Sequence, residues 1–449
     1  MRSVNMNICL YFESKKIFSK PAVFAGYLAL YLSLLSSATL ASEQPPLTLA
    51  ELVDLAVEHD PWLERSRALE QALLSEAIAV GELPDPMVSA TLLNFPTDTF
   101  KFAQEPMTQI RFGYTQSFPG GDSRDLQRRV KTLQSERQAL DQAVRLKTIE
   151  LQVTDLWLDL YLARSTAQLI KIDRPLFEQL IEVTNASYRS ATRKVSLQDL
   201  IRAQLELTRL DDRLLRLHEI QDSRHKELAE WLPMKLLAIP ISWQIPNELA
   251  LSPVRETEAE RLYQLLSKHP ELRSSDHSIA ATRVGLRLAR EATKPDWAVN
   301  AAYGYRDEDR FGNDLADFVT LGVTFQLPLF KKNRQNKQIA AAADLVSADE
   351  SGRVVRLQQL TRRYLKAYAT LDSLDERLDL YQGSLLRQMD ALAEASLSAY
   401  TTDEGDFADV MRAYVALLNA KIEARTIEVN RLKVLAEIRY IAVNPENAL

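Results

Sequence analysis

The sequence is poor in the residues that interrupt long helices. Its 449 residues include only 12 glycines and 18 prolines. Because these residues form most turns, their scarcity argues against several ordinary globular domains and favours long helices. The chain has one cysteine, Cys9, which excludes an intrachain disulfide and a multi-cysteine metal site.

The chain also lacks an excess of positive charge. Its 55 basic and 61 acidic residues give a formal net charge of −6. Proteins that bind nucleic acid usually carry a basic patch, so we expect no nucleic-acid partner. With 26% charged and 46% hydrophobic residues, the chain is neither disordered nor a helical protein with many membrane spans.

Motifs for catalysis are absent as well. The sequence has no phosphate-binding loop, no dinucleotide-binding glycine motif, no nucleophile elbow and no zinc-protease motif. His218 and His225 would share a helix face, but two imidazoles without a third ligand make a poor metal site. We therefore expect no enzymatic activity, no cofactor and no bound metal.

The N-terminus has the pattern of a secretory signal peptide. Three lysines within 15–20 precede an apolar run over 22–35, and small residues follow over 36–41. We expect residues 1–41 to be removed during export. The alternative is a retained membrane anchor, which is less favoured because the apolar run is short for a spanning helix.

The chain contains an internal duplication with a period near 209 residues. The sequence EHDPWL at 58–63 returns as KHPEL at 268–272, and FGYTQSFP at 112–119 returns as LGVTFQLP at 321–328. A repeat of this length indicates two duplicated halves, each with a helix, a β-hairpin and a long helical hairpin. The predicted first repeat is 42–252, with its β-hairpin at 84–119 and its helical hairpin at 122–232, and the second is 253–449, with 295–328 and 334–441.

The long helices carry the pattern of a coiled coil. Nine positions from 357 to 385 follow alternating steps of three and four, and every one is Leu, Ala or Tyr. Eight of eleven such positions between 126 and 161 are apolar. A helix over 123–188 would be about 100 Å long. The alternative, a buried helix of a large α-domain, explains the apolar seam but not the length.

Segments with alternating polarity lie between the helices. At 297–305 and 319–327 the odd positions are apolar or aromatic, apart from Ala301, and the even positions are mostly small or polar. Strands of about ten residues with one apolar face are typical of β-barrels that cross a bilayer. The predicted lipid-facing residues are Trp297, Val299, Tyr303, Tyr305, Val319, Leu321, Val323 and Phe325, and the predicted lumen residues are Asn300, Arg306, Thr320, Thr324 and Gln326.

Four strands cannot close a membrane barrel by themselves. An open sheet leaves unpaired backbone groups at its edges, and the bilayer interior contains no water to bind them. If the strands span a membrane, several copies of the chain must therefore share one barrel. The alternative is a secreted or periplasmic coiled-coil scaffold with a soluble sheet packed on its helices, and alternation alone does not distinguish the two.

Two segments resemble the TolC-type outer-membrane channel family, the outer membrane factors. The sequence GDFADVMRAYVALLNAKIEARTIEVNRLKVLAEI at 405–438 resembles the family's segment after the lower turn of the second helical hairpin. The sequence YRSATRKVSLQDLIRAQLEL at 188–207 is similar to the equivalent first turn. With the duplication and the strand–proline–helix junctions, the resemblance covers about 47–443. The stretch 81–121 looks most like the branch that serves heavy-metal efflux pumps.

The resemblance implies a mixed α/β membrane protein with long antiparallel helical hairpins and four strands per chain. Three copies would form one barrel in the outer membrane of a Gram-negative bacterium, with the helices forming a tunnel in the periplasm. Such a homotrimer is a passive conduit, surrounded by outer-membrane lipid. It receives substrate from an inner-membrane efflux pump through a periplasmic adaptor, and heavy-metal cations are one candidate cargo.

The resemblance also assigns roles to the periplasmic ends of the helices. Family members can close the tunnel with acidic residues near the start of the last helix. Asp409 matches the first such position, but Arg412 stands at the second, which implies a mixed-charge gate. The alternative is an exposed ion pair on one helix. The first turn lacks the family's frequent glycine, so the tighter contact is expected at Gly405. The implied adaptor-contacting residues are Thr192, Arg193, Lys194, Val195, Ser196, Leu197, Asp403, Glu404, Gly405, Asp406 and Phe407.

Overall fold

The computed structural model describes residues 45–190, 196–402 and 404–442. The chain divides into two units after Pro46, and the elements below belong to the unit that begins at Leu47. The predicted signal peptide, 1–41, lies outside the described residues. No helix in the described ranges is both long enough and apolar enough to cross a membrane.

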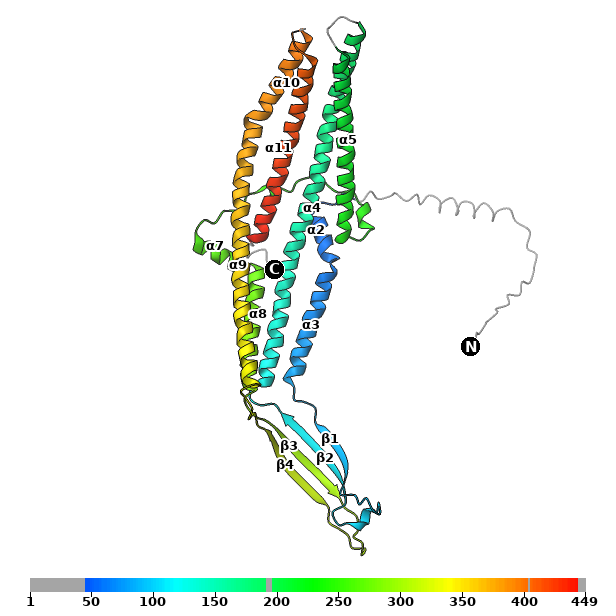
Figure 1. Cartoon of the computed structure of the whole chain (residues 1–449), viewed down its shortest axis with the longest axis vertical. Helices are drawn as coiled ribbons and strands as arrows, with labels where there is room; N and C mark the ends of the chain where they lie inside the picture. Colours follow the sequence, from blue (N-terminus) through cyan, green and yellow to red (C-terminus); the bar gives the residue numbers. More distant parts are fainter. Residues whose placement is uncertain (1–44, 191–195, 403, 443–449) are drawn as a thin grey trace, which may run out of the picture. The chain divides into compact units, whose positions relative to one another are not determined.

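The two halves repeat one order of elements, which confirms the predicted fold class (Figure 1). The repeat boundaries at 252 and 253 stay a prediction. The first half contains α2 (Leu49–Glu58), α3 (Pro61–Gly81), β1 (Met87–Leu93), η1 (Phe102–Gln104), β2 (Gln109–Phe118), α4 (Ser123–Ser190), α5 (Leu197–Glu227), η2 (Leu228–Glu230), η3 (Leu236–Ala238) and α6 (Asn247–Ala250). The second contains α7 (Ala259–Ser267), α8 (Pro270–Glu291), β3 (Asp296–Tyr305), β4 (Phe318–Gln326), α9 (Gln335–Leu380), the π-helical turn η4 (Tyr381–Leu385), α10 (Leu386–Thr401) and α11 (Phe407–Ile441).

Helix α4 is the central element of the helical part. It contacts α3, α5, α8 and α11, while α9 packs on α8 and α11. With 68 residues it is about 100 Å long, as predicted. The seam predicted on α9 is also confirmed, since its middle positions Leu360, Tyr364, Ala367, Leu371 and Leu374 are buried.

The seam predicted on α4 is too narrow. Leu133 and Leu158 from that seam are buried, but Ile149, Val153 and Trp157, which lie outside it, are buried as well. Neighbouring helices cover α4 on more than one side, so a single stripe of period 3.5 does not describe its buried surface.

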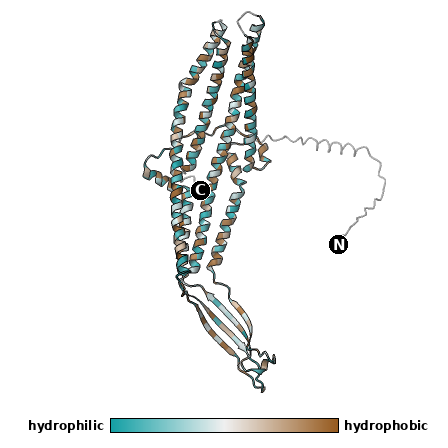
Figure 2. Ribbon diagram, viewed as in Figure 1, coloured by the Kyte–Doolittle hydropathy of each residue, from teal (hydrophilic) through white to brown (hydrophobic). Residues whose placement is uncertain are grey.

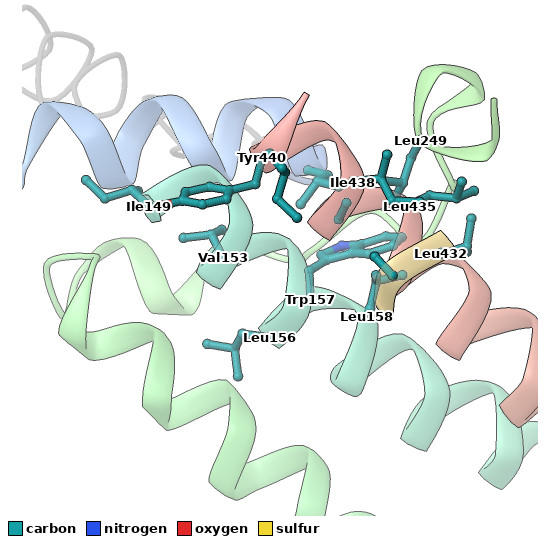
Figure 3. Packing of buried hydrophobic residues seen from close by; sticks show 14 of the residues in the cluster. Ile149, Val153, Leu156, Trp157, Leu158, Leu249, Leu432, Leu435, Ile438 and Tyr440 are labelled. Atoms are coloured by element: carbon teal, nitrogen blue, oxygen red, sulfur yellow. The ribbon is translucent and has the colours of Figure 1, made fainter. Parts of the chain in front are cut away.

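Trp157 lies at the centre of the larger hydrophobic cluster. Figure 3 shows it beside side chains of α11, among them Leu432 and Leu435, and Leu249 of α6 belongs to the same cluster. Its indole Nε1–H donates to the carbonyl oxygen of Ser242 at 3.1 Å, so the segment that links the halves is fixed to the core. A second cluster joins α4, α5 and α11 nearer the helix tips and includes Phe177.

The first residues of this unit are also held by the linking segment. The backbone N–H of Leu47 donates to the carbonyl of Pro240 at 2.8 Å. The N–H of Ser242 donates to the carbonyl of Leu47 at 2.7 Å, and Leu47 forms a parallel bridge with Ile241. These bonds satisfy backbone groups that would otherwise lie unpaired beside the core.

The N-caps of α3 and α8 differ between the two halves. Both helices have proline at their first position, where no N–H is needed. In the first half the N-cap is Asp60, whose Oδ1 accepts from the Trp62 N–H at 3.1 Å. Arg145 donates to both carboxylate oxygens of Asp60, at 2.7 and 3.2 Å. His59, the residue before this N-cap, is exposed.

In the second half the N-cap is a buried histidine. The His269 Nδ1 accepts from the Glu271 N–H at 3.3 Å, so the ring proton lies on Nε2, which donates to the Tyr440 carbonyl at 3.1 Å. The Tyr440 hydroxyl donates to Glu271 Oε1 at 2.6 Å. This neutral imidazole joins the start of α8 to the end of α11, and burial lowers the pKa of His269.

Substituting His269 by asparagine should reduce the acid sensitivity of the fold. The unfolded chain takes up the proton near pH 6.5, but the folded chain takes it up only at lower pH. The contribution of His269 to stability is therefore lost as pH falls below about 6.5. We expect the unfolding temperature to fall less between pH 7.5 and pH 5 in H269N than in wild type. H59N, at the exposed histidine, is the control. Equal pH dependence in all three proteins would contradict the assignment.

Candidate functional site: a two-faced sheet and the helix tips

The four strands form one antiparallel sheet in the order β1-β2-β3-β4. Figure 1 shows this sheet beyond the ends of α3, α4, α8 and α9, to which the strands are joined. Within the described residues, β1 and β4 each pair on one side only. The central pair, β2 and β3, joins the two duplicated halves.

The residues predicted to face lipid share one face of the sheet. The register places Trp297 opposite Phe325, Val299 opposite Val323 and Tyr303 opposite Val319. These side chains are exposed, with Val319 at 74% and Leu321 at 77%. Large apolar side chains on a surface mark a site of interaction. Strands β1 and β2 extend the same face with Val88, Leu92, Ile110, Phe112 and Tyr114.

Hydrophobic segments occur along the strands of the sheet (Figure 2). The register places aromatic residues at both ends of the apolar face. At the end nearest the helices, Phe118 stacks on Trp297 with ring centroids 4.3 Å apart. At the far end, Tyr303 and Tyr305 lie on the same face, and Tyr303 bonds to Asp317. Aromatic rings at two levels, with aliphatic residues between them, are typical of strands that cross a bilayer.

The opposite face is polar and carries its own hydrogen bonds. The hydroxyl of Thr115 donates to Asn300 Oδ1 at 2.9 Å, and Asn300 Nδ2 donates to Thr324 Oγ1 at 2.9 Å. This chain of side chains crosses β2, β3 and β4. Thr320 and Gln326 share the face, because they pair with Ala302 and Asp296. Four of the five residues predicted to line a lumen therefore lie on this face, away from the apolar face.

Arg306 lies just beyond the end of β3 rather than within the strand. Its Nε donates to the carbonyl of Ala316 at 2.7 Å, and its Nη1 donates to the carbonyl of Pro106 at 3.2 Å. Its guanidinium carbon lies 3.9 Å from the ring centre of Phe318. Arg306 therefore joins the connections of the two β-hairpins, contacts that alternation along the sequence does not reveal.

Glycines make the junction between β2 and α4 compact. The Gly120 N–H donates to Asp296 Oδ1 at 2.6 Å, and a Cβ at Gly120 would lie 2.6 Å from the carbonyl oxygen of Pro295. Gly121 has φ +60°, a left-handed conformation that glycine adopts without strain. The N–H of Asp122 donates to Glu291, so both duplicated halves meet at this point.

The two described parts of the helix tips are held by short-range hydrogen bonds. Ser196 caps α5, with its Oγ accepting from the Asp199 N–H at 3.3 Å, and Leu197 is exposed. In the second tip, the N–H groups of Glu404 and Gly405 both donate to the carbonyl oxygen of Ala399, each at 3.0 Å. The predicted contacts Thr192, Arg193, Lys194, Val195 and Asp403 lie outside the described residues.

Phe407 differs from the other described tip residues because its side chain is buried. Its ring lies 5.6 Å from that of Tyr400, in an edge-on arrangement, within the second hydrophobic cluster. Asp406 caps the same helix, since its Oδ1 accepts from the Ala408 N–H at 3.3 Å. In the single chain, Phe407 therefore fixes the turn from inside, while Glu404, Gly405 and Asp406 are exposed.

The two predicted gate residues form an ion pair on one helix. Arg412 donates to Asp409 and also to the carbonyl of Ala408 at 3.3 Å. Both side chains are exposed. A groove of about 720 Å³ between α5 and α11 lies beside them, lined in part by Arg202, Arg209, Met411 and Arg412. The described residues contain no group of three His, Cys, Asp or Glu side chains placed to hold a metal.

Solved structures with the same arrangement are found by structural comparison, although no family model and no curated protein sequence matches the chain. A crystal structure of CusC gives a TM-score of 0.74 at 13% identity and covers 90% of this chain and 94% of that chain. The outer membrane protein VceC of Vibrio cholerae gives 0.71 at 16%, covering 88% and 96%. The MtrE outer membrane channel of Neisseria gonorrhoeae gives 0.67 at 13%, covering 88% of each.

The chain thus has a duplicated fold of helical hairpins joined to a four-stranded sheet. This is the fold of the TolC-type outer-membrane channels, as the sequence resemblance predicts. At 13–16% identity, these structures show that the chain shares their fold, and its function is argued from its own residues.

Replacing Gly120 by alanine should destabilise the junction. The added Cβ would meet backbone atoms of Pro295, which cannot move without displacing β3. We expect a loss of about 1–3 kcal/mol in the free energy of unfolding, measured by denaturant titration. Gly322→Ala is the matched control, because its Cβ would meet nothing within 4 Å. A G120A protein as stable as G322A would show that the junction is not tightly packed.

Proposed function

We propose that this chain is the outer-membrane channel component of a tripartite efflux system. The observation that carries the proposal is the sheet, which has an exposed apolar face, a hydrogen-bonded polar face and two open edges. A surface of this kind suits hydrocarbon on one side and water on the other. Helix α4 of the same chain is about 100 Å long, a length suited to a periplasmic tunnel.

The open edges support a barrel shared by several copies, and the family resemblance gives their number as three. Unpaired backbone groups are costly in a bilayer, so β1 of one copy must pair with β4 of another. Three copies would supply twelve strands, enough for a barrel with a water-filled interior. The similar structures of MtrE and VceC are described as an outer membrane channel and an outer membrane protein, which supports the same location here.

The remaining roles follow from this arrangement. The barrel would lie in the outer membrane of a Gram-negative bacterium and the helices in the periplasm. The exposed tip residues 196–197 and 404–406 would meet a periplasmic adaptor that connects the channel to an inner-membrane pump. The chain would act as a passive conduit rather than an enzyme. The resemblance of 81–121 makes heavy-metal cations one candidate cargo, and the metal tolerance of a strain that lacks this chain tests that candidate.

Arginine substitutions on the two faces of β4 test the membrane role. Leu321→Arg places a charge on the apolar face, and Thr320→Arg places it on the polar face one residue away. In lipid vesicles we expect L321R to lose about 2–4 kcal/mol of folding free energy and T320R to lose little, because only the apolar face would contact hydrocarbon.

The contrary result would favour the scaffold alternative. If both variants are as stable as wild type, and the mature chain is a monomer without detergent, then the sheet is not in a membrane. Fractionation of cells gives an independent measurement, since a channel would be recovered with the outer membrane and a scaffold with the soluble periplasm.

The pair Asp409 and Arg412 should affect ion flow if it lines the tunnel. We expect Asp409→Lys and Arg412→Glu, tested separately in planar bilayers, to change the single-channel conductance, because each changes the charge at a constriction. Asp409→Lys should lower the preference for cations, and Arg412→Glu should raise it. The control is Arg216→Glu on α5, an exposed residue that pairs with Asp212 and lies outside the groove beside the gate pair. Unchanged conductance in both variants would place the pair on the outer wall.

A further inference from the structure

We propose that residues 327–337, which connect β4 to α9, bind anionic phospholipid headgroups at the membrane surface nearest the helices. This inference rests on the proposed function, because it requires the sheet to lie in a bilayer. The segment is called the β4–α9 junction below.

The β4–α9 junction exposes apolar and cationic side chains in sequence. Leu327 is 60% exposed, Leu329 75% and Phe330 89%. They continue the exposed apolar residues of β4 beyond the end of that strand. Four exposed cations follow, and the sequence has no acidic residue from 327 to 343. The cations are Lys331, Lys332, Arg334 and Lys337.

None of these four cations forms an ion pair with any residue that the structure describes. By contrast, the four arginines and lysines of α4 nearest the sheet all have carboxylate or carbonyl partners: Arg124, Arg128, Arg129 and Lys131. Four unpaired cations within seven residues repel one another, so an anion that binds among them would be stabilised. The start of α9 adds to this attraction, since Arg334 at its N-cap makes no side-chain cap and the first turn has no acidic residue.

The duplicated half provides an internal comparison. At the equivalent junction between β2 and α4, Arg124 donates to the carbonyl of Gly81 at 3.1 Å. Lys294, from the adjoining end of α8, pairs with Glu291 at 2.6 Å, and Gly120 is buried against Pro295. One junction is therefore closed by internal contacts, while the other is open. The fold itself does not require the cations of the β4–α9 junction to be unpaired.

The far end of the β3–β4 hairpin carries charge of the opposite sign. The connection 307–317 between β3 and β4 contains five acidic residues and one basic residue. The two ends of the β4 hairpin would therefore face the two membrane surfaces with different charge. A net positive charge at one end and a net negative charge at the other suit the anionic headgroups of one leaflet better than general solubility.

The order of residues favours a lipid over a free phosphate or an acidic protein. Apolar side chains beside the strand can enter the boundary of the hydrocarbon, while the lysines after them extend to the phosphates. A free phosphate would not use Leu329 and Phe330. An acidic protein surface would not need them to continue the apolar face of β4.

The test compares two triple variants with equal changes in charge. K331Q/K332Q/R334Q removes three cations of the β4–α9 junction, and K171Q/K226Q/K235Q removes three exposed, unpaired lysines of the helical part. Each mature protein is purified in a neutral detergent. Native mass spectrometry then measures the affinity for phosphatidylglycerol and for phosphatidylcholine. We expect the junction variant to bind phosphatidylglycerol at least about tenfold more weakly than wild type, and the helix variant to bind it as wild type does.

Three outcomes would overturn the inference. The two variants could bind phosphatidylglycerol equally, wild type could bind phosphatidylcholine as tightly, or inorganic phosphate could displace the lipid completely. Dissociation of the junction variant into monomers without added lipid would instead assign the cations to a contact between copies, which also contradicts a lipid site.

Insertion into vesicles separates this failure from that of the proposed function. If wild type inserts into phosphatidylcholine vesicles, and adding phosphatidylglycerol does not increase insertion, only the lipid site is wrong. If wild type inserts into neither kind of vesicle, the channel proposal fails, and the lipid site fails with it.

Discussion

The unpaired backbone groups along β1 and β4 are the constraint on which the proposed channel depends. Each edge strand has N–H and C=O groups that need partners, and a bilayer interior offers none. The sheet's exposed apolar face suits contact with lipid, but lipid cannot hydrogen-bond the backbone groups at the edges. A single chain therefore cannot provide partners for both. The duplication places two hairpins side by side, so that one chain supplies a continuous four-stranded segment with two open edges, β1 and β4.

The helices solve a different problem, which is to hold strands from distant parts of the sequence together. Helix α4 contacts helices from both halves, and its central tryptophan fixes the segment between the halves to the core. The glycine junction before α4 and the polar ladder across β2, β3 and β4 connect the same halves at the sheet. The sheet is therefore positioned by contacts that cross the duplication at several levels.

Regular patterns made much of this architecture predictable from sequence. The period of 3.5 on α9 and the alternation on β3 and β4 report directly which side of an element is buried or exposed. Strand β1 alternates less clearly because Met87 and Leu93 lie on the polar face. Its place in the sheet follows only from its pairing with β2.

Features that depend on tertiary contacts were not accessible in this way. The buried surface of α4 requires knowledge of its several neighbours. Three further features depend on residues distant in sequence. They are the burial of Phe407, the carbonyl partners of Arg306, and the histidine, His269, that stands as N-cap where the first half has Asp60. Even so, the aspartate before Pro61 has the N-cap signature, so that assignment could have been made from sequence.

The backbone bonds of Leu47 have a consequence for the order of events during biogenesis. Leu47 completes these bonds only when 240–242 have also been synthesised. The first residues of this unit must therefore wait for nearly the whole first half of the chain. Until then, buried residues of α2 such as Leu49 and Leu52 lack part of the cluster in which they pack.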